Sequence, residues 1–483
     1  MKTAARIAIS AVAFALVAAG CSSSDEQSAP LTPDGLAAAV TTDAMVAHLD
    51  ALDKIARENG GNRAAGTTGY DASVAYVTSK LKEKGFDVQT PEFDIHDFEV
   101  NGESLKAGDR DFKISALGYS PATPKDGVRG RLAVLPTGDK PGCDATDYDG
   151  IDVRGAIALV HRGDCTFAAK EKLAAEHGAV ALLVVVAGDD IRVGTLGEDN
   201  SAKLPTAAIS DKDVDALVGS GEATLAIDSK STTLKSKNII AQTKTGSADN
   251  VIMVGAHLDS VPEGPGINDN GTGSAAVLET ALQLGSEPNV ANAVRFAWWG
   301  GEELGLLGST DYVDHLSPDQ RLDIAMYLNF DMLGSPNPGY LTYDGDNSDK
   351  LGEPAGPDGS AAIERVFNSF LLREGVTPDG TDFDGRSDYG PFIEHKIPSG
   401  GVFSGAEEIK SAAEAAKWGG EADKPFDPNY HAPGDTLANV NREVFGRNGD
   451  AVAYSVATYA LSIEGPNGVP SRADRASARG DDK

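Results

Sequence analysis

Cationic side chains are scarce in this chain. Its 483 residues include 42 lysine and arginine residues against 73 aspartate and glutamate residues, which gives a formal net charge of −31 and a pI near 4.5. A surface this acidic repels phosphate backbones and anionic membranes, so binding to nucleic acid or directly to lipid head groups is disfavoured. The length is sufficient for two or three domains, each with its own core.

Two catalytic signatures are also missing. The sequence contains no G-x-S-x-G, the turn that carries the nucleophile of many serine hydrolases. It contains no H-E-x-x-H either, the helical zinc motif of one class of metalloenzymes. Any hydrolytic chemistry in this chain must therefore use other residues.

Long apolar runs are confined to the beginning of the chain. The apolar stretch 7–19 follows two basic residues and is too short to span a membrane, so we expect residues 1–20 to be a signal peptide. The run LVAAGC, which ends at Cys21, resembles the lipobox of bacterial lipoproteins. The resemblance implies a lipid on Cys21, a tether over 21–39 and a location at the outer face of the cell membrane. An ordinary secretory signal is the alternative.

Only two further cysteines occur, Cys143 and Cys165. In an exported protein such a pair suggests one disulfide, and two reduced, buried thiols are the alternative. Both lie in the block 119–234, in which GAIALVHRGDCTFAAKEKLAAEHGAVALLVV and LPTAAIS resemble the protease-associated domain, a small β-rich module. The resemblance implies a bridged cysteine pair and a domain that shapes a substrate entrance without chemistry of its own. We interpret His161 and His177 in this block as structural or solvated residues and not as metal ligands.

One strand, loop and helix unit stands at the centre of the sequence. The apolar run Val251–Ala256 predicts a buried strand, and His257 and Asp259 follow at its end. A loop rich in glycine and proline then leads to Asp269 and to a predicted helix, Ala275–Leu284. In open α/β sheets, ligands bind at the carboxyl ends of the strands.

Two further apolar runs, Val294–Trp299 and Ala325–Phe330, are also followed by acids. Glu302 and Glu303 come after the first run, and Asp331 comes after the second. If the three strands are parallel neighbours, these groups converge, and a cluster of carboxylates is unfavourable without a cation. Oxygen ligands together with imidazole suit a divalent metal, above all zinc. Three solvated acidic loops are the alternative.

Near the end of the chain, the segment FDPNYHAPGDTLANV adds a second histidine to the set. The candidate ligands are then His257, Asp269, Glu303, Asp331 and His431. These can hold two metal ions, because one carboxylate, that of Asp269, can be shared while each ion keeps two further ligands. His257 and Asp331 would complete one site, and Glu303 and His431 the other.

Two acids remain outside this ligand set. Glu302, adjacent to the ligand Glu303, can act as a general base. Asp259, two residues after His257, can accept the proton on the other ring nitrogen of that histidine and so fix its tautomer.

The motifs AHLDSV, GINDNGTG, WWGGEELGLLGS, LNFDMLG, GRSDYGPF and NYHAPGDT together resemble the secreted bacterial di-zinc aminopeptidases. These are the leucine and Streptomyces-type enzymes of peptidase clan MH, here in an actinobacterial lipoprotein form. The resemblance covers residues 40–118 and 235–464, with the protease-associated domain inserted between them. It implies a three-layer α/β/α fold with a mixed central sheet and two zinc ions per chain.

The same resemblance assigns roles to individual residues. It implies that Glu302 is the general base, that Asp269 bridges the metals and that Tyr430 stabilises the tetrahedral intermediate. The region around Arg386 is expected to help hold the free amine of the substrate. Tyr389 stands where many relatives carry histidine, a difference that concerns the wall of the pocket more than the metals.

The charge pattern indicates which end of a peptide is bound. A protonated α-amine would be attracted to Glu302 and Asp331, whereas a terminal carboxylate would need a cluster of cations that the motifs lack. Phe392, Val402 and Phe403 suggest a preference for leucine, phenylalanine or methionine. A related di-zinc carboxypeptidase, a non-catalytic receptor of the same fold and a small aminoacyl substrate are the alternatives. We expect a monomer that contacts a membrane only through its lipid.

The rest of the chain is less informative. The acidic loop 334–357 lacks the glycine and the terminal glutamate of a calcium loop, so a calcium site there is only weakly indicated. The tail 465–483, rich in arginine, aspartate and serine, is predicted to be disordered. Helices are predicted at Thr42–Glu58, Gly69–Lys84, Cys165–His177, Ala361–Glu374 and Ala451–Leu461.

Overall fold

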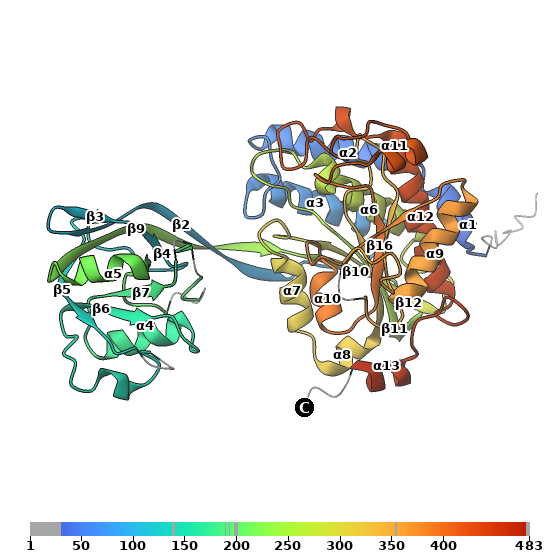
Figure 1. Ribbon diagram of the computed structural model, residues 1–483. Helices are drawn as coiled ribbons and strands as arrows, with labels where there is room; N and C mark the ends of the chain where they lie inside the picture. Colours follow the sequence, from blue (N-terminus) through green and yellow to red (C-terminus); the bar gives the residue numbers. More distant parts are fainter. Residues whose placement is uncertain are drawn as a thin grey trace, which may run out of the picture.

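The protein has a large lobe and a smaller inserted lobe, joined by a long two-stranded ribbon (Figure 1). The predicted signal peptide 1–20 and Cys21 lie outside the residues that the structure describes. The computed structural model describes residues 30–137, 141–188, 190–192, 194–197, 201–352 and 355–479. Within these ranges, every helix is too short or too polar to span a bilayer.

The large lobe is built on a mixed sheet of eight strands. Across the sheet the order is β1 (Val88–Gln89), β10 (Ile239–Gln242), β12 (Asn292–Trp299), β11 (Ser247–His257), β13 (Ile324–Phe330), β16 (Ser399–Phe403), β14 (Leu341–Tyr343) and β15 (Asp379–Thr381). The central strands β12, β11, β13 and β16 run parallel to one another. Their apolar runs are buried because helices cover both faces of the sheet.

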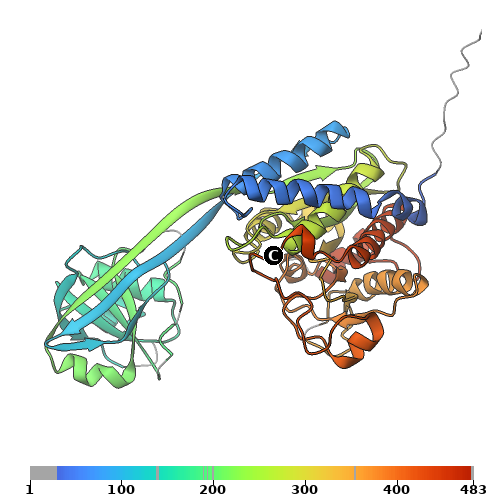
Figure 2. The same cartoon turned by 90° about the horizontal axis from the view of Figure 1, so that it is seen from above.

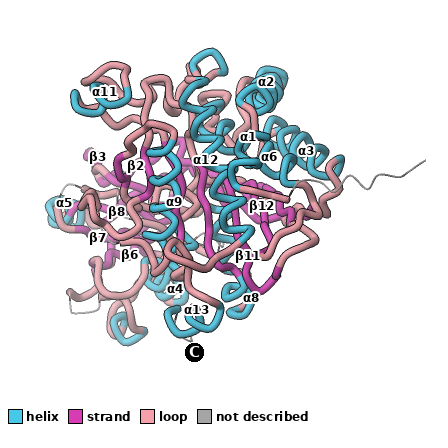
Figure 3. Tube along the Cα trace, turned by 90° about the vertical axis from the view of Figure 1, so that its right-hand side faces the viewer, coloured by secondary structure: helices cyan, strands magenta, loops and turns pink. Residues whose placement is uncertain are grey.

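Alternate residues of β11 enter two separate cores. Ile252 and Val254 belong to one core and Met253 to the other, as the period of two in a strand requires. The predicted three-layer α/β/α fold is therefore confirmed. Helices α9 and α12 lie side by side over the first core (Figure 3), and α7 and α10 contribute to the second. The first face carries α1 (Pro33–Ala39), α2 (Thr42–Glu58), α3 (Thr68–Glu83), α6 (Gly273–Leu284), α9 (Ser360–Arg373) and α12 (Arg442–Leu461); the second carries α7 (Leu307–Asp314) and α10 (Gly390–Glu394).

Helix α2 shows why the predicted helices form where they do. The hydroxyl of Thr41 accepts a hydrogen bond from the Ala44 amide at 3.3 Å, which caps the helix at its start. Met45, Leu49 and Ala56 are buried on one face of the helix, at the spacing of an amphipathic stripe.

The inserted lobe contains the second sheet of the structure. Its order is β3 (Arg110–Phe112), β2 (Glu92–Ala107), β9 (Glu222–Lys237), β5 (Val128–Val134), β6 (Ala156–His161), β7 (Ala181–Val186), β8 (Thr206–Ser210) and β4 (Ile114–Ala116). Helices α4 (Phe167–Glu176) and α5 (Asp211–Val218) pack on it. The His177 ring stacks on Tyr148 with centroids 4.3 Å apart, which agrees with a structural role for this histidine.

The ribbon between the lobes is formed by β2 and β9 (Figure 2). These strands pair antiparallel from Glu92 opposite Lys237 to Lys106 opposite Thr224. The sheet of the inserted lobe thus includes strands from residues 92–116, which we had predicted to belong to the first peptidase segment. The central part of β2 is exposed and polar. The amino-acid composition therefore does not mark the start of the inserted lobe, and the predicted boundary falls after the ribbon.

The tail also differs from its prediction. Residues 472–479 form helix α13, and its Arg475 and Arg479 are buried although the segment is strongly charged. Arg475 donates a hydrogen bond to the Asp249 carbonyl at 2.7 Å, and Arg479 donates one to the Ile324 carbonyl at 2.9 Å. These carbonyls lie at the starts of β11 and β13. The guanidinium groups therefore order a segment whose composition predicts disorder. The remaining helices are α8 (Pro318–Asp323), which contacts α13, and α11 (Ala412–Trp418).

Cys143 and Cys165 are joined by a disulfide in the inserted lobe, as the resemblance implied. The bridge connects the segment after β5 to the start of α4 across a sequence separation of 22 residues. It lies in the lobe that carries none of the candidate metal ligands.

Removal of this bridge should destabilise the inserted lobe alone. The double variant Cys143→Ser/Cys165→Ser is expected to lose about 2–4 kcal/mol of unfolding free energy, the usual contribution of such a loop closure. Thermal unfolding of the wild type with and without reductant measures the effect, and the double variant in reductant is the control. An unchanged melting temperature after complete reduction, or free thiols in protein isolated from the cell envelope, would contradict this prediction.

Candidate functional site

The carboxyl ends of three parallel strands bring predicted ligands together. His257 ends β11, Glu302 and Glu303 follow β12, and Asp331 follows β13. Because β11 pairs in parallel with both neighbours, the three strand ends meet at one edge of the sheet, where ligands bind in folds of this class.

Asp269 reaches the same edge from η2 (Ile267–Thr272), an irregular turn before α6 whose peptide bond between Asp269 and Asn270 is cis. Its carboxylate lies between two histidines. Oδ1 is 3.2 Å from Nε2 of His257, and Oδ2 is 3.2 Å from Nε2 of His431. The two oxygens of one carboxylate therefore face two different imidazoles.

Each histidine also contacts a second carboxylate. Asp331 Oδ1 lies 3.2 Å from His257 Nε2, and Glu303 Oε2 lies 2.9 Å from His431 Nε2. The buried Oε1 of Glu303 has no hydrogen-bond partner among the described residues. The five predicted ligands thus form two groups that share Asp269. This set of oxygen and nitrogen donors, with an orphaned buried oxygen, fits a divalent cation such as zinc.

Burial and neighbouring charges shift the pKa values of these groups. Burial raises the pKa of Glu303 to about 7, and the nearby charge of Asp269 adds to the rise. Burial alone would lower the pKa of His431, but hydrogen bonds to Asp269 and Glu303 raise it to about 10. Protons and a metal ion compete for the same atoms, so metal binding should release protons and weaken as the pH falls.

Asp259 holds two functional residues by different atoms. We predicted that its carboxylate would accept the second ring proton of His257. Instead, the main-chain oxygen of Asp259 lies 3.1 Å from His257 Nδ1, whereas its carboxylate is 3.7 Å away. Carboxylate oxygen Oδ1 accepts a hydrogen bond from the Glu302 amide at 3.3 Å. Burial raises the pKa of Glu302 well above its usual value, and nearby His257 offsets only part of this rise.

Arg386 is held by acidic and phenolic oxygens. It forms ion pairs with Glu407 at 2.8 Å and Glu408 at 3.7 Å, and it donates a hydrogen bond to the Tyr430 hydroxyl at 3.2 Å. The expected role of this region in holding the free amine of the substrate stays a prediction. The Tyr430 ring stacks on His431 with centroids 3.8 Å apart.

Only some of the residues predicted to form the pocket wall line the cavity. The Tyr389 hydroxyl donates a hydrogen bond to Asp384 at 2.7 Å. Phe403 and Tyr389 line the cavity beside the site, but Phe392 stacks on Tyr327 at 3.9 Å in the second core, and Val402 lies in the first core. Because β16 alternates between faces, Val402 and Phe403 cannot both face the same cavity.

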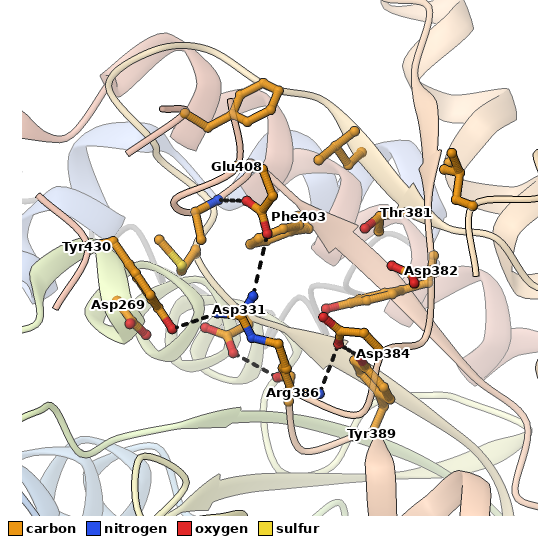
Figure 4. Close-up of a pocket in the computed structure, with 18 of the residues that line it drawn as sticks. Asp269, Asp331, Thr381, Asp382, Asp384, Arg386, Tyr389, Phe403, Glu408 and Tyr430 are labelled. Atoms are coloured by element: carbon orange, nitrogen blue, oxygen red, sulfur yellow. Dashed lines mark hydrogen bonds and ion pairs between the residues drawn. The ribbon is translucent and has the colours of Figure 1, made fainter. Parts of the chain in front are cut away.

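The cavity has a volume of about 280 Å³ and is lined by Asp269, Glu302, Glu303, Asp331 and Tyr430 together with residues from 332–426 (Figure 4). No described residue of the inserted lobe lines it. The entrance-shaping role implied for that lobe therefore does not include the cavity wall.

Sequence reasoning missed two residues that hold the loop around Asp269. Arg63 is fully buried, and its guanidinium donates hydrogen bonds to the carbonyls of Leu258, Pro265 and Gly266. Asp435 accepts hydrogen bonds from the Asn268 amide at 2.6 Å and from the Asp269 amide at 3.0 Å. Asp435 lies within the motif NYHAPGDT, which is a signal for it, whereas Arg63 has only the signal of a charged residue before a predicted helix, which is common on surfaces.

One more acid, Asp388, was given no role from the sequence. Ser387 donates a hydrogen bond to Asp331 Oδ2 at 2.7 Å. Its neighbour Asp388 is fully buried, and burial raises its pKa to about 7.

In the acidic loop, Asp344 lies near Asp346 and Glu364, but its oxygens accept hydrogen bonds from the amides of residues 348 and 349. These hydrogen bonds account for the position of Asp344 without calcium.

A three-layer α/β/α domain with histidine and carboxylate donors at the strand ends, interrupted by a β-rich insertion, defines a metallo-exopeptidase. Residues 238–456 match peptidase family M28, and residues 128–217 match the PA domain. The chain belongs to peptidase family M28 and is a metallo-aminopeptidase with an inserted PA domain.

Several relatives carry aminopeptidase names. A probable lipoprotein aminopeptidase, LpqL, of Mycobacterium tuberculosis is 52% identical over 479 residues, which cover 96% of each chain. Leucine aminopeptidase 2 of Trichophyton rubrum is 41% identical over 84% of this chain and 81% of the relative. An aminopeptidase of Pseudomonas aeruginosa is 40% identical over 90% of this chain and 83% of the relative.

Solved structures show the same fold. An aminopeptidase from an Aneurinibacillus strain superimposes with a TM-score of 0.60 at 26% identity, covering 90% of this chain and 97% of the other. A zinc aminopeptidase from Bacillus subtilis gives a TM-score of 0.53 at 27% identity, covering 88% and 97%.

Asp435→Asn should weaken the metal site without changing its ligands. Asparagine has one acceptor oxygen, so the variant would place an amide donor against a main-chain N–H group and lose one of the two hydrogen bonds. We expect metal affinity to fall about 10–100-fold, the scale of losses from partners that orient ligands. Zinc retention at increasing chelator concentration measures this.

The control for this variant is Asp126→Asn, which makes the same chemical change at an exposed position of the inserted lobe. Equal zinc retention by both variants would show that Asp435 does not orient Asp269.

Proposed function

We propose that this zinc aminopeptidase binds two zinc ions per chain and removes single residues from the free N-termini of peptides. The observation that carries the proposal is the position of Asp269, whose two carboxylate oxygens each lie 3.2 Å from a different histidine. His257, Asp269 and Asp331 would hold one zinc ion. His431, Asp269 and Glu303 would hold the other.

We assign the role of general base to Glu302. Bound zinc would lower the pKa of a coordinated water and polarise the scissile carbonyl. Glu302 lines the cavity and is paired with neither imidazole by a contact below 4 Å among the described residues, so its carboxylate can take the proton from the attacking water and pass it to the leaving amine. The Tyr430 hydroxyl also lines the cavity and would donate a hydrogen bond to the oxygen of the tetrahedral intermediate.

The charges of the cavity favour the N-terminal end of a peptide. Glu302 and Asp331 attract a protonated α-amine. Arg386 is the one cation that lines the cavity within the described ranges, and two glutamates pair with it. This supports an aminopeptidase over the related carboxypeptidase, which needs a cationic clamp.

Apolar lining residues support a preference for large side chains such as leucine, phenylalanine or methionine over small ones. Met332, Leu341, Phe403 and Phe426 all line the cavity. Complete burial of a large apolar side chain contributes about 1.5–3 kcal/mol, which is enough to separate such residues from alanine or glycine.

We further propose that the chain is exported and anchored at the outer face of the cell membrane through a lipid on Cys21. The run LVAAGC supports this, as does the relative whose name describes a lipoprotein aminopeptidase. Secretion without a lipid is the alternative.

Glu302→Gln tests the proposed base and the proposed metal count together. The substitution keeps the side-chain size and all five proposed ligands, so the protein should retain close to two zinc ions per chain. Its kcat should fall about a hundredfold or more, the usual scale for removal of a general base. Metal analysis after zinc reconstitution and turnover of leucine p-nitroanilide provide the two measurements.

His257→Ala is the comparison, because loss of a ligand should lower the zinc content itself. A wild-type stoichiometry that stays near one would remove the bridging role from Asp269. Turnover of Glu302→Gln close to that of the wild type would show that another group is the base.

The substrate end is tested with one leucine-initiated peptide, its N-acetylated form and its C-amidated form. The enzyme should remove leucine from the first and third peptides and leave the acetylated one intact, because acetylation removes the positive charge that the carboxylates attract. Mass spectrometry of the products distinguishes the two ends. Shortening of the acetylated peptide from its C-terminus, with amidation blocking the reaction, would favour the carboxypeptidase.

A further inference from the structure

The cavity beside the proposed zinc site is lined by two chemically different sets of residues. One set is apolar and includes Met332, Leu341, Phe403 and Phe426. Apolar side chains of this kind accept aliphatic or aromatic groups of a ligand.

The other set is acidic. Beyond the proposed ligands and base, four carboxylates line the cavity: Asp382, Asp384, Glu408 and Glu414. Figure 4 shows Asp382 at the end away from Asp269, with Asp384 and Phe403 between them. A side chain that starts at the zinc site and extends along Phe403 therefore ends among carboxylates.

The one cation that lines this cavity in the described part of the chain pairs with only one of these four acids. Arg386 is already paired with Glu407, which lies outside the lining, and with Glu408. Arg386 also donates a hydrogen bond to the Tyr430 hydroxyl. It forms no ion pair with Asp382 or Asp384 at the far end.

Among these four acids, Asp382 is the one with neither an ion pair nor a hydrogen bond to another described residue. Its side chain is half-buried, and no cation contacts its carboxylate among the described residues. By contrast, Asp384 accepts hydrogen bonds from the Tyr389 hydroxyl and from the Arg386 amide. Burial raises the pKa of Asp382, and the charge of Asp384 adds to the rise. A half-buried carboxylate in this position favours a cationic ligand.

We infer that the cavity binds the side chain of an N-terminal arginine or lysine, with its aliphatic stem against Phe403 and its charged end at Asp382. The inference rests on the proposed function, since the α-amine and the scissile bond must lie at the zinc site. Long cationic side chains bury their stems on apolar surface and keep the charge at a polar end. Leucine reaches the apolar set but leaves Asp382 without a partner. Peptides with basic N-terminal residues are therefore substrates alongside those with large apolar ones.

The test compares matched substrates that differ in side-chain charge. Zinc-loaded full-length protein is assayed with the p-nitroanilides of arginine and citrulline, and with those of lysine and norleucine. Within each pair the α-amine is the same and the stem is nearly the same, so the ratio of kcat/KM values reports the charge at the far end. We expect each cationic substrate to exceed its neutral partner about tenfold or more, the scale of one hydrogen bond to a charged group.

Two variants locate the effect. Asp382→Asn keeps the shape of the side chain and removes its charge, so both ratios should fall toward one. Asp346→Asn removes an exposed acid that does not itself line the cavity, and its ratios should stay within about twofold of the wild type.

Wild-type ratios near one, or ratios unchanged by Asp382→Asn, would overturn the inference and leave the aminopeptidase reaction intact. If the enzyme hydrolysed none of the four substrates and also left leucine p-nitroanilide intact, the result would count against the proposed function and the inference together.

Discussion

The shared carboxylate of Asp269 is the interaction on which the rest of the site depends. Its two oxygens point to His257 and His431, and a second acid stands beside each histidine. So many carboxylates in a buried place repel one another and are stable only when cations oppose them. The parallel strands bring these acids to one edge of the sheet. The main chain around Asp269 must then be fixed by other means, because it is neither strand nor regular helix.

Arg63 and Asp435 supply that support from opposite ends of the sequence. Carbonyl groups in a buried irregular loop need donors, and Arg63 provides them from the segment between α2 and α3. Asp435 receives the amides of the same loop and follows His431 by four residues. A displacement of either segment would therefore reach the proposed zinc ligands directly. The site is thus formed by the whole large lobe.

The strands and the ligand groups could be predicted because they depend on local patterns. Val251–Ala256 is apolar throughout, and the chemistry of His257 follows at once. The contacts of Arg63 depend on distant pairing, since its partner Leu258 is 195 residues away. The role of Asp259 was only partly predicted because its main-chain oxygen, which every residue has, makes the closer contact to His257. Helix α13 was missed because its arginines are buried by hydrogen bonds to carbonyls, and composition does not reveal such partners.

Helix α1 and the inserted lobe lie at opposite ends of the molecule (Figures 1 and 2). With a lipid on Cys21, the α1 end would face the membrane and the inserted lobe would be the part held farthest from it. Strands β2 and β9 each have 16 residues, so each strand would span about 50 Å at the rise of an extended strand, which includes the ends that pair with β3 and β5 inside the inserted lobe. Two hydrogen-bonded strands can bend and twist but cannot lengthen. A polypeptide that approaches from outside the cell would then meet the inserted lobe at a distance from the catalytic edge that the length of the ribbon limits.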